Sequence, residues 1–168
     1  MKIKWSVIVY CAICNLAVCF FLCLTSAGAG VTNFDNWTIV VDLKNINWTN
    51  VLINYLVSYS LAMIIGCFIP LTNIGRWFTG LFHIQNETYT GNMPYRLLAT
   101  LIISFIYWII LSPSLVILNA FILRVTTWQQ GLLSMVINGP IMLLVGFVSS
   151  LINDLAAYKA AHRIDETF

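Results

Sequence analysis

Residues 48–73 read WTNVLINYLVSYSLAMIIGCFIPLTN, and residues 128–153 read WQQGLLSMVINGPIMLLVGFVSSLIN. A shift of 80 positions aligns the two stretches without a gap and keeps their apolar character throughout. It matches Trp48 with Trp128, Leu52 with Leu132, Gly66 with Gly146, Leu71 with Leu151 and Asn73 with Asn153. Each stretch supplies the run of about 20 apolar residues that a helix needs to cross a bilayer. We interpret the two stretches as the second helices of a duplicated membrane hairpin.

The composition supports a membrane protein. The 168 residues are 60% hydrophobic and only 8% charged, with a mean hydropathy of +0.89. Soluble proteins carry about 25% charged residues, so this chain has too few polar groups to cover a surface that faces water. Its formal net charge of +2, without any long basic run, argues against a nucleic-acid partner. Membrane lipids are the partners that this composition predicts.

The positions of the charges predict four transmembrane helices. Charge-free spans cover residues 5–34, 45–75, 97–123 and 125–153. Each is longer than the roughly 20 residues that span about 30 Å of hydrocarbon. We therefore predict helices at residues 5–25, 51–71, 97–122 and 131–152. The expected fold class is all-α, a polytopic membrane protein made of two repeated hairpins.

The basic residues predict the orientation and the domain plan. With both termini in the cytoplasm, the inner segments hold every Lys and Arg except Lys44 and Arg124, which is a clear positive-inside bias. The plan is then a first hairpin, a cytoplasmic linker, a second hairpin and a cytoplasmic tail, at residues 1–75, 76–96, 97–153 and 154–168.

The first apolar segment has two interpretations. Lys2 and Lys4 precede an apolar run, and Ala27-Gly28-Ala29 resembles the small-residue cleavage site of a signal peptide. However, the apolar run from Trp5 to Leu24 exceeds the usual signal-peptide core of about 7–15 residues. We therefore expect the segment to stay in the membrane as a helix.

Four of the five cysteines lie in this first segment, at Cys11, Cys14, Cys19 and Cys23, and Cys67 lies in the second. Cys11-x-x-Cys14 has the spacing of a redox motif, but no base or cation is nearby to generate a thiolate within the hydrocarbon. We expect these cysteines to act as small apolar packing residues.

Aromatic and basic residues at the span ends predict anchors at the membrane interface. The anchors that we expect are Trp37, Trp48, Arg76, Trp77 and Trp128. The linker that contains Arg76 and Trp77 is expected to form an amphipathic surface segment.

Polar and helix-breaking residues inside the spans are candidates for helix packing or for a substrate path. They are Asn54, Ser58, Ser60, Asn119, Asn138 and Pro140. Hydrogen bonds between membrane helices explain them without a substrate, whereas broken helices at matched positions of a repeat can mark a transport site. We expect a kink at Pro113 and a break at Asn138-Gly139-Pro140.

Several function classes lack the residues that they need. The four predicted helices contain no Asp, Glu, Lys, Arg or His, which weighs against a proton-driven transporter. His83 and Glu87 stand four apart and can pair on a helix, but a metal site needs more ligands. We recognise no catalytic, cofactor-binding or metal-binding constellation, so we predict that the protein is not an enzyme and needs no cofactor.

The pattern Trp48-x-x-x-Leu52, through Ser60-Leu61-Ala62 to Pro70-Leu71, resembles a bacterial family of short two-helix membrane proteins known only as a domain of unknown function. Residues 97–105, LLATLIISF, followed by residues 128–153, resemble a second copy, with Ser149-Ser150 where the first copy has Ile69-Pro70. The resemblance implies a tandem fusion, a bacterial source and the inner (plasma) membrane. It implies no activity and no site residues.

Two functions remain. The first is a structural or interaction protein of the inner membrane, either a homo-oligomer or an accessory subunit of a membrane-protein partner, and the lack of ionisable groups favours it. The alternative is a small carrier or pore for an uncharged or amphipathic small molecule, favoured by the repeat and the paired mid-helix positions.

The topology can be tested directly. A reporter that is active only in the cytoplasm, fused after Gln85, should give a signal because this linker is predicted to face the cytoplasm. A silent fusion at this position would contradict the four-helix topology.

Overall fold

A computed structural model of the chain describes residues 4–33, 38–41, 46–84 and 92–165. Its long helices are α1 (Trp5–Gly28), α2 (Trp48–Phe68), α4 (Met93–Ile117) and α5 (Trp128–His162), and a π-helix, η1 (Leu118–Ile122), extends α4. All four, α4 together with η1, are long and apolar enough to cross a membrane, which confirms the number and type of the predicted helices.

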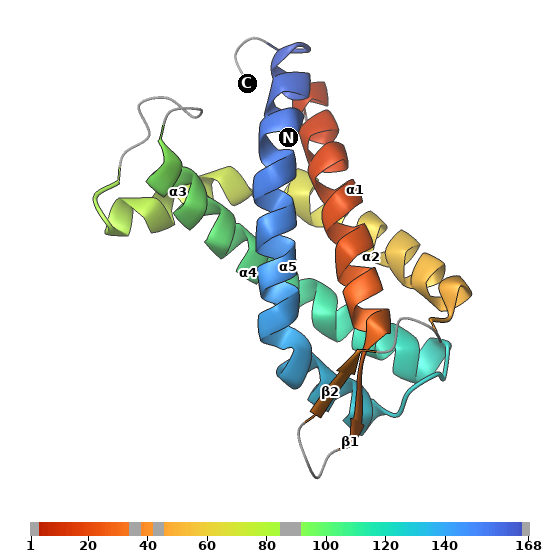
Figure 1. Ribbon diagram of the computed structural model, residues 1–168. Coiled ribbons are helices and arrows are strands. Elements are labelled where there is room, and N and C mark those ends of the chain that lie inside the picture. The colour runs from red at the N-terminus through yellow and green to blue at the C-terminus, as the bar shows by residue number, and fades with distance from the viewer. Residues whose placement is uncertain (1–3, 34–37, 42–45, 85–91, 166–168) are drawn as a thin grey trace.

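Helices α1 and α5 lie side by side, and α2 and α4 run obliquely behind them (Figure 1). The most extensive packing joins α1 to α5, followed by α1 with α2 and α4 with α5. An ion pair of 3.0 Å between Lys4 Nζ and Asp165 Oδ2 brings the first and last described segments together. We call this the terminal end of the bundle, and the opposite end, where α2 and α5 begin, the hairpin end.

The hairpin end carries two short strands that the sequence did not lead us to expect. Strands β1 (Ala29–Asn33) and β2 (Thr38–Val41) pair in antiparallel fashion, with Ala29 opposite Val41 and Val31 opposite Ile39. We expected the apolar run of residues 38–41 only as part of a loop between the first two helices. Its β-branched residues favour a strand once a partner strand lies alongside.

Three helices begin at side-chain caps. The side chains of Asn47, Asn92 and Thr127 accept hydrogen bonds from backbone N–H groups at the starts of α2, α4 and α5. Gln130 completes a capping box with Thr127. These bonds satisfy backbone donors that a helix start leaves unpaired, which explains why the helices begin at these positions.

The difference between Ile69-Pro70 and Ser149-Ser150 has a structural consequence. Helix α2 ends at Phe68, and the chain turns at Pro70 into the short helix α3 (Leu71–Leu81). Helix α5, in contrast, continues through Ser149 and Ser150 to His162, beyond the predicted end at residue 152. One face of α3 buries Leu71, Gly75 and Thr79 while Trp77 is exposed, so the segment is amphipathic as expected.

The break that we predicted at Asn138-Gly139-Pro140 is wrong, because α5 is continuous across it. Helix α4 contains Pro113 within its length before it passes into η1, and the kink expected there stays a prediction. A proline removes one backbone hydrogen bond, and a membrane helix tolerates this loss when neighbouring groups compensate. Close packing also holds α5 at this point, since a Cβ atom at Gly139 would lie 2.7 Å from the Trp108 ring.

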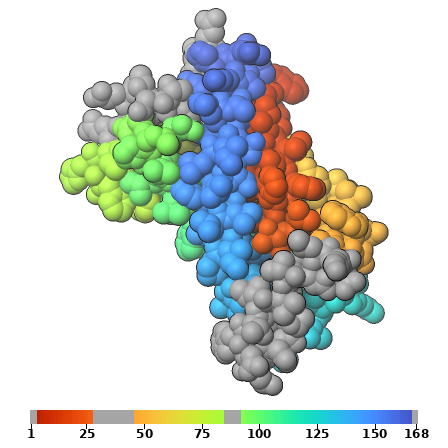
Figure 2. Space-filling model, in the orientation of Figure 1, coloured from red at the N-terminus to blue at the C-terminus, as the bar shows by residue number. Residues whose placement is uncertain are grey.

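The surface of the bundle is largely apolar. Helices α1 and α5 form a closed seam on one face (Figure 2). Large apolar side chains are exposed on every long helix, among them Phe21, Leu56, Phe105 and Ile152. The best-buried apolar cluster contains Cys19, Ala62, Ile65, Leu71 and Leu111. Such a surface is stable only in an apolar solvent, which fits the hydrocarbon of a membrane.

Close contact between α4 and α5 can be tested at Gly131. A Cβ atom there would lie 2.7 Å from Val116 Cγ1, so we expect Gly131→Ala to destabilise the bundle by about 1–3 kcal/mol through overpacking. The measurement is the midpoint of unfolding by sodium dodecyl sulfate from mixed micelles. Gly80→Ala is the matched control, because no heavy atom lies within 4 Å of the new Cβ. Equal midpoints for the two variants would contradict the contact.

Candidate functional site

A cavity of about 580 Å³ lies among α1, the α2–α3 turn, α4 and α5. Its size is within the range of small-molecule sites, roughly 300–1,000 Å³. Apolar side chains and glycines form much of the wall, including Val18, Leu22, Gly66, Ile103 and Leu143. Charged side chains gather at the terminal end, where Lys4, Arg76, Arg96 and Asp154 contribute to the lining.

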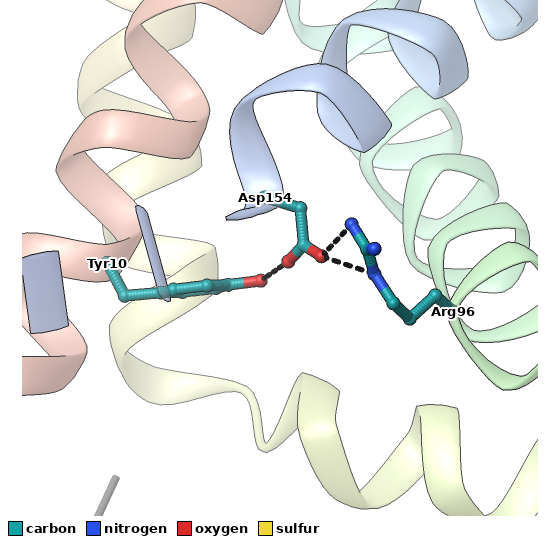
Figure 3. Close-up of polar contacts among 3 residues, drawn as sticks. All are labelled: Tyr10, Arg96 and Asp154. Atoms are coloured by element: carbon teal, nitrogen blue, oxygen red, sulfur yellow. Dashed lines mark hydrogen bonds and ion pairs between the residues drawn. The ribbon is translucent and has the colours of Figure 1, made fainter. Parts of the chain in front are cut away.

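The centre of this charged region is a three-residue cluster from three helices (Figure 3). Arg96 of α4 donates from Nε and Nη2 to Asp154 Oδ2 of α5, at 3.3 and 3.2 Å. Tyr10 of α1 donates its hydroxyl hydrogen to the other carboxylate oxygen, Oδ1. The Asp154 side chain is 5% exposed and that of Arg96 is 12% exposed, so the ion pair is almost fully buried.

Because the side chains of Arg96 and Asp154 are both almost fully buried, each charge needs the other as a partner. An isolated charge in a low-dielectric interior costs several kcal/mol, and a partner with good hydrogen-bond geometry offsets that cost. The predicted helices at residues 97–122 and 131–152 contain no ionisable side chain, but their bounds are too short. Both helices extend beyond the charge-free spans, and the extensions bring Arg96 and Asp154 into the bundle.

A second polar group lies deeper in the cavity wall. Asn15 Nδ2 donates to the hydroxyl of Tyr107 at 3.5 Å, and this hydroxyl donates to the backbone carbonyl of Ala62 at 3.4 Å. The indole Nε1 of Trp108 is buried and has no hydrogen-bond partner among the residues that the structure describes. The middle of the cavity therefore contains hydrogen-bonding groups as well as apolar surface.

All five cysteines are free thiols. Cys11, Cys14 and Cys67 line the cavity, while Cys19 and Cys23 pack elsewhere in the interior, with Cys23 Sγ 3.3 Å from Ser58 Oγ. No group of three His, Cys, Asp or Glu side chains in the described part of the chain has a metal-binding arrangement.

Two of the predicted packing or path residues meet at the hairpin end. Asn54 Nδ2 donates to Asn119 Oδ1 at 3.1 Å, and Asn119 Nδ2 donates to Asn54 Oδ1 at 2.8 Å. This reciprocal amide pair joins α2 to η1. It provides the kind of hydrogen bond between helices that polar residues make in membranes.

The other predicted residues lie apart from this pair. Ser58 and Asn138 are buried, whereas Ser60 and Pro140 are exposed. The side chains of Ser60 and Asn138 bond within their own helices, to the Leu56 carbonyl and to Ser134 Oγ. The cavity lining includes none of the six predicted residues.

The predicted interface anchors are exposed where the structure describes them. Trp48, Trp77 and Trp128 present 62%, 65% and 43% of their surface, and Arg76 is exposed beside Trp77. Trp37 lies outside the described residues, and so does Glu87 of the predicted pair with His83.

The sequence contained a signal for the cluster that we did not use. If the last two helices form an antiparallel hairpin, the start of one and the end of the other lie together. Arg96 precedes one charge-free span and Asp154 follows the other, so an ion pair between them could have been predicted. The contribution of Tyr10 depends on the packing of α1 against α5, which the sequence pattern does not specify.

No protein-family model, curated protein or solved structure matches this chain. The functional argument therefore depends on the residues themselves.

Removal of one ion-pair partner should be strongly destabilising. We expect Arg96→Leu to lower stability by about 3–5 kcal/mol because it leaves Asp154 charged and buried. The double variant Arg96→Leu/Asp154→Leu should recover most of this loss.

The exposed pair Lys4–Asp165, with side chains 63% and 24% exposed, is the control. Lys4→Leu should lower stability by less than about 1 kcal/mol. Unfolding midpoints in mixed micelles measure all three effects, and equal losses for Arg96→Leu and Lys4→Leu would contradict the assignment.

Proposed function

We propose that this multi-pass membrane protein binds an amphipathic small molecule in its cavity, as a small carrier does. The observation that carries the proposal is the cavity of about 580 Å³, apolar along much of its wall and charged at one end. Pockets of this size and character, with a few polar groups that fix orientation, are typical of small-molecule sites. A purely structural subunit, which the sequence favoured, needs no such space between its helices.

We further propose that both termini lie in the cytoplasm, so that the charged end of the cavity faces this side. The support is the excess of Lys and Arg in the segments that would then be cytoplasmic. The inner membrane of a bacterium is our proposed location, on the basis of the family resemblance.

A tandem origin of the two halves remains part of the proposal. In its support, α2 and α5 begin at the matched residues Trp48 and Trp128, each directly after a capping residue, Asn47 or Thr127.

We propose a binding function rather than catalysis. In the charged cluster, Asp154 accepts hydrogen bonds from both Tyr10 and Arg96. Its carboxylate oxygens are therefore engaged, which makes it a poor general base. The alternative without catalysis is a structural or accessory role, in which the cavity binds no specific small molecule.

The test is native mass spectrometry of the protein released from nanodiscs, with a cavity-filling variant. Ser150 lines the cavity, so Ser150→Phe should displace a bound small molecule and raise its Kd by at least about tenfold, a loss of about 1.4 kcal/mol in binding. Ser60→Phe is the matched control, because Ser60 is exposed and does not line the cavity. A protein that carries only loosely bound lipid, equally in both variants, would favour the structural role.

A further inference from the structure

We propose that the ligand is a single-chain amphiphile with an oxyanion headgroup, a carboxylate or a phosphate, and that the headgroup binds Arg96 next to Asp154. This inference rests on the proposed function and specifies the chemical class of the ligand.

The charges at the terminal end favour an anion. Three cationic side chains, Lys4, Arg76 and Arg96, line the cavity, against one carboxylate, Asp154. Lys4 is shared with Asp165 and Arg96 with Asp154. Arg76 forms no ion pair with any residue that the structure describes. The excess positive charge attracts an anionic group to this end of the cavity.

The geometry of Arg96 leaves room for a second anion. A guanidinium group has five N–H donors in a fixed plane. Arg96 directs Nε and Nη2 toward a single oxygen of Asp154, while the other oxygen is occupied by Tyr10. The remaining N–H groups of Arg96 have no bond to another described residue, although the side chain is only 12% exposed. Guanidinium donors on a mostly buried side chain are well suited to carboxylate and phosphate oxygens.

The rest of the cavity is long enough for one hydrocarbon chain. Lining residues extend from Lys4, directly before α1, to Leu22, from Tyr95 to Trp108 on α4 and from Tyr158 to Met142 on α5. Measured from the charged cluster inward, the lining continues for 12 residues on each helix, to Leu22, Trp108 and Met142, or about 18 Å at 1.5 Å per residue. The three helices therefore surround an elongated space with one charged end, the shape of an extended single-chain amphiphile.

Asp154 then limits the affinity of the site for its ligand. Its negative charge repels an oxyanion bound to the same guanidinium, so it holds the affinity for the ligand below what Arg96 alone would give. Neutral Asp154→Asn removes this repulsion and leaves Arg96 without its anionic partner. An anionic ligand should therefore bind this variant more tightly and restore its stability.

The experiment compares three probes with the same chain, palmitic acid, hexadecanol and hexadecylamine, with the full-length protein in nanodiscs. We expect the acid to bind at least about tenfold more tightly than the alcohol, and the amine to bind most weakly.

In Asp154→Asn the affinity for the acid should rise about tenfold while that for the alcohol stays the same. Palmitic acid, but not hexadecanol, should raise the unfolding midpoint of this variant more than that of the native protein. Arg76→Gln, a surface change, should weaken binding of the acid alone.

The outcomes separate the two proposals. If hexadecanol and hexadecylamine bind as tightly as palmitic acid, and Ser150→Phe abolishes all three, the cavity binds amphiphiles and the anionic class is wrong. If inorganic phosphate competes with palmitic acid at equal concentration, the site binds free anions and the hydrocarbon chain is wrong. If no probe binds in a way that Ser150→Phe abolishes, the proposed function itself is wrong. Should Asp154→Asn fail to fold, as shown by lost binding of hexadecanol, Arg76→Gln decides between these outcomes.

Discussion

The ion pair between Arg96 and Asp154 is the contact on which the arrangement of this bundle most depends. The long helices all expose apolar side chains, and a membrane gives such side chains little reason to prefer a neighbouring helix over lipid. Arg96 and Asp154 behave differently, because separating them inside the bundle would leave each charge desolvated and unpaired. Since the partners belong to α4 and α5, and Tyr10 adds α1, one cluster fixes three helices at the terminal end. The amide pair of Asn54 and Asn119 joins α2 to η1 at the opposite end.

The cluster arises from differences between the two halves of the chain rather than from their similarity. Under the shift of 80 positions, Asp154 corresponds to Ile74, which lies on α3 beyond the turn at Pro70. Helix α2 ends before that turn, whereas α5 continues past Ser149 and Ser150 and carries Asp154 into the bundle. The same turn places Leu71, Thr72, Gly75 and Arg76 in the cavity wall. A helix break in one half and its absence in the other therefore account for both the charged group and the space beside it.

Local signals in the sequence predicted the helices well and the site poorly. Apolar runs between charges identified four spanning helices, because the requirement for about 20 apolar residues acts within each segment. The same rule placed Arg96 and Asp154 outside the membrane helices, since it treats a charge as a boundary and cannot show that a partner on another helix makes it tolerable. The break predicted at Asn138-Gly139-Pro140 is wrong, because α5 is continuous there and Gly139 packs closely against the Trp108 ring. The strands β1 and β2 were missed although only four residues separate them, because β1 contains Ala, Gly and Asn, which are depleted in strands.

The buried carboxylate also changes the argument about transport. The absence of ionisable groups from the predicted helices weighed against proton-driven transport, but α5 extends beyond its predicted end and includes Asp154. Both of its carboxylate oxygens are engaged, however, because the Tyr10 hydroxyl donates to one and the Arg96 guanidinium to the other. A proton relay through Asp154 would have to break the ion pair that joins α4 to α5. The group with unused capacity is Arg96, whose remaining N–H donors border an apolar cavity. Chemistry at this site is therefore better suited to holding an anion than to moving a proton.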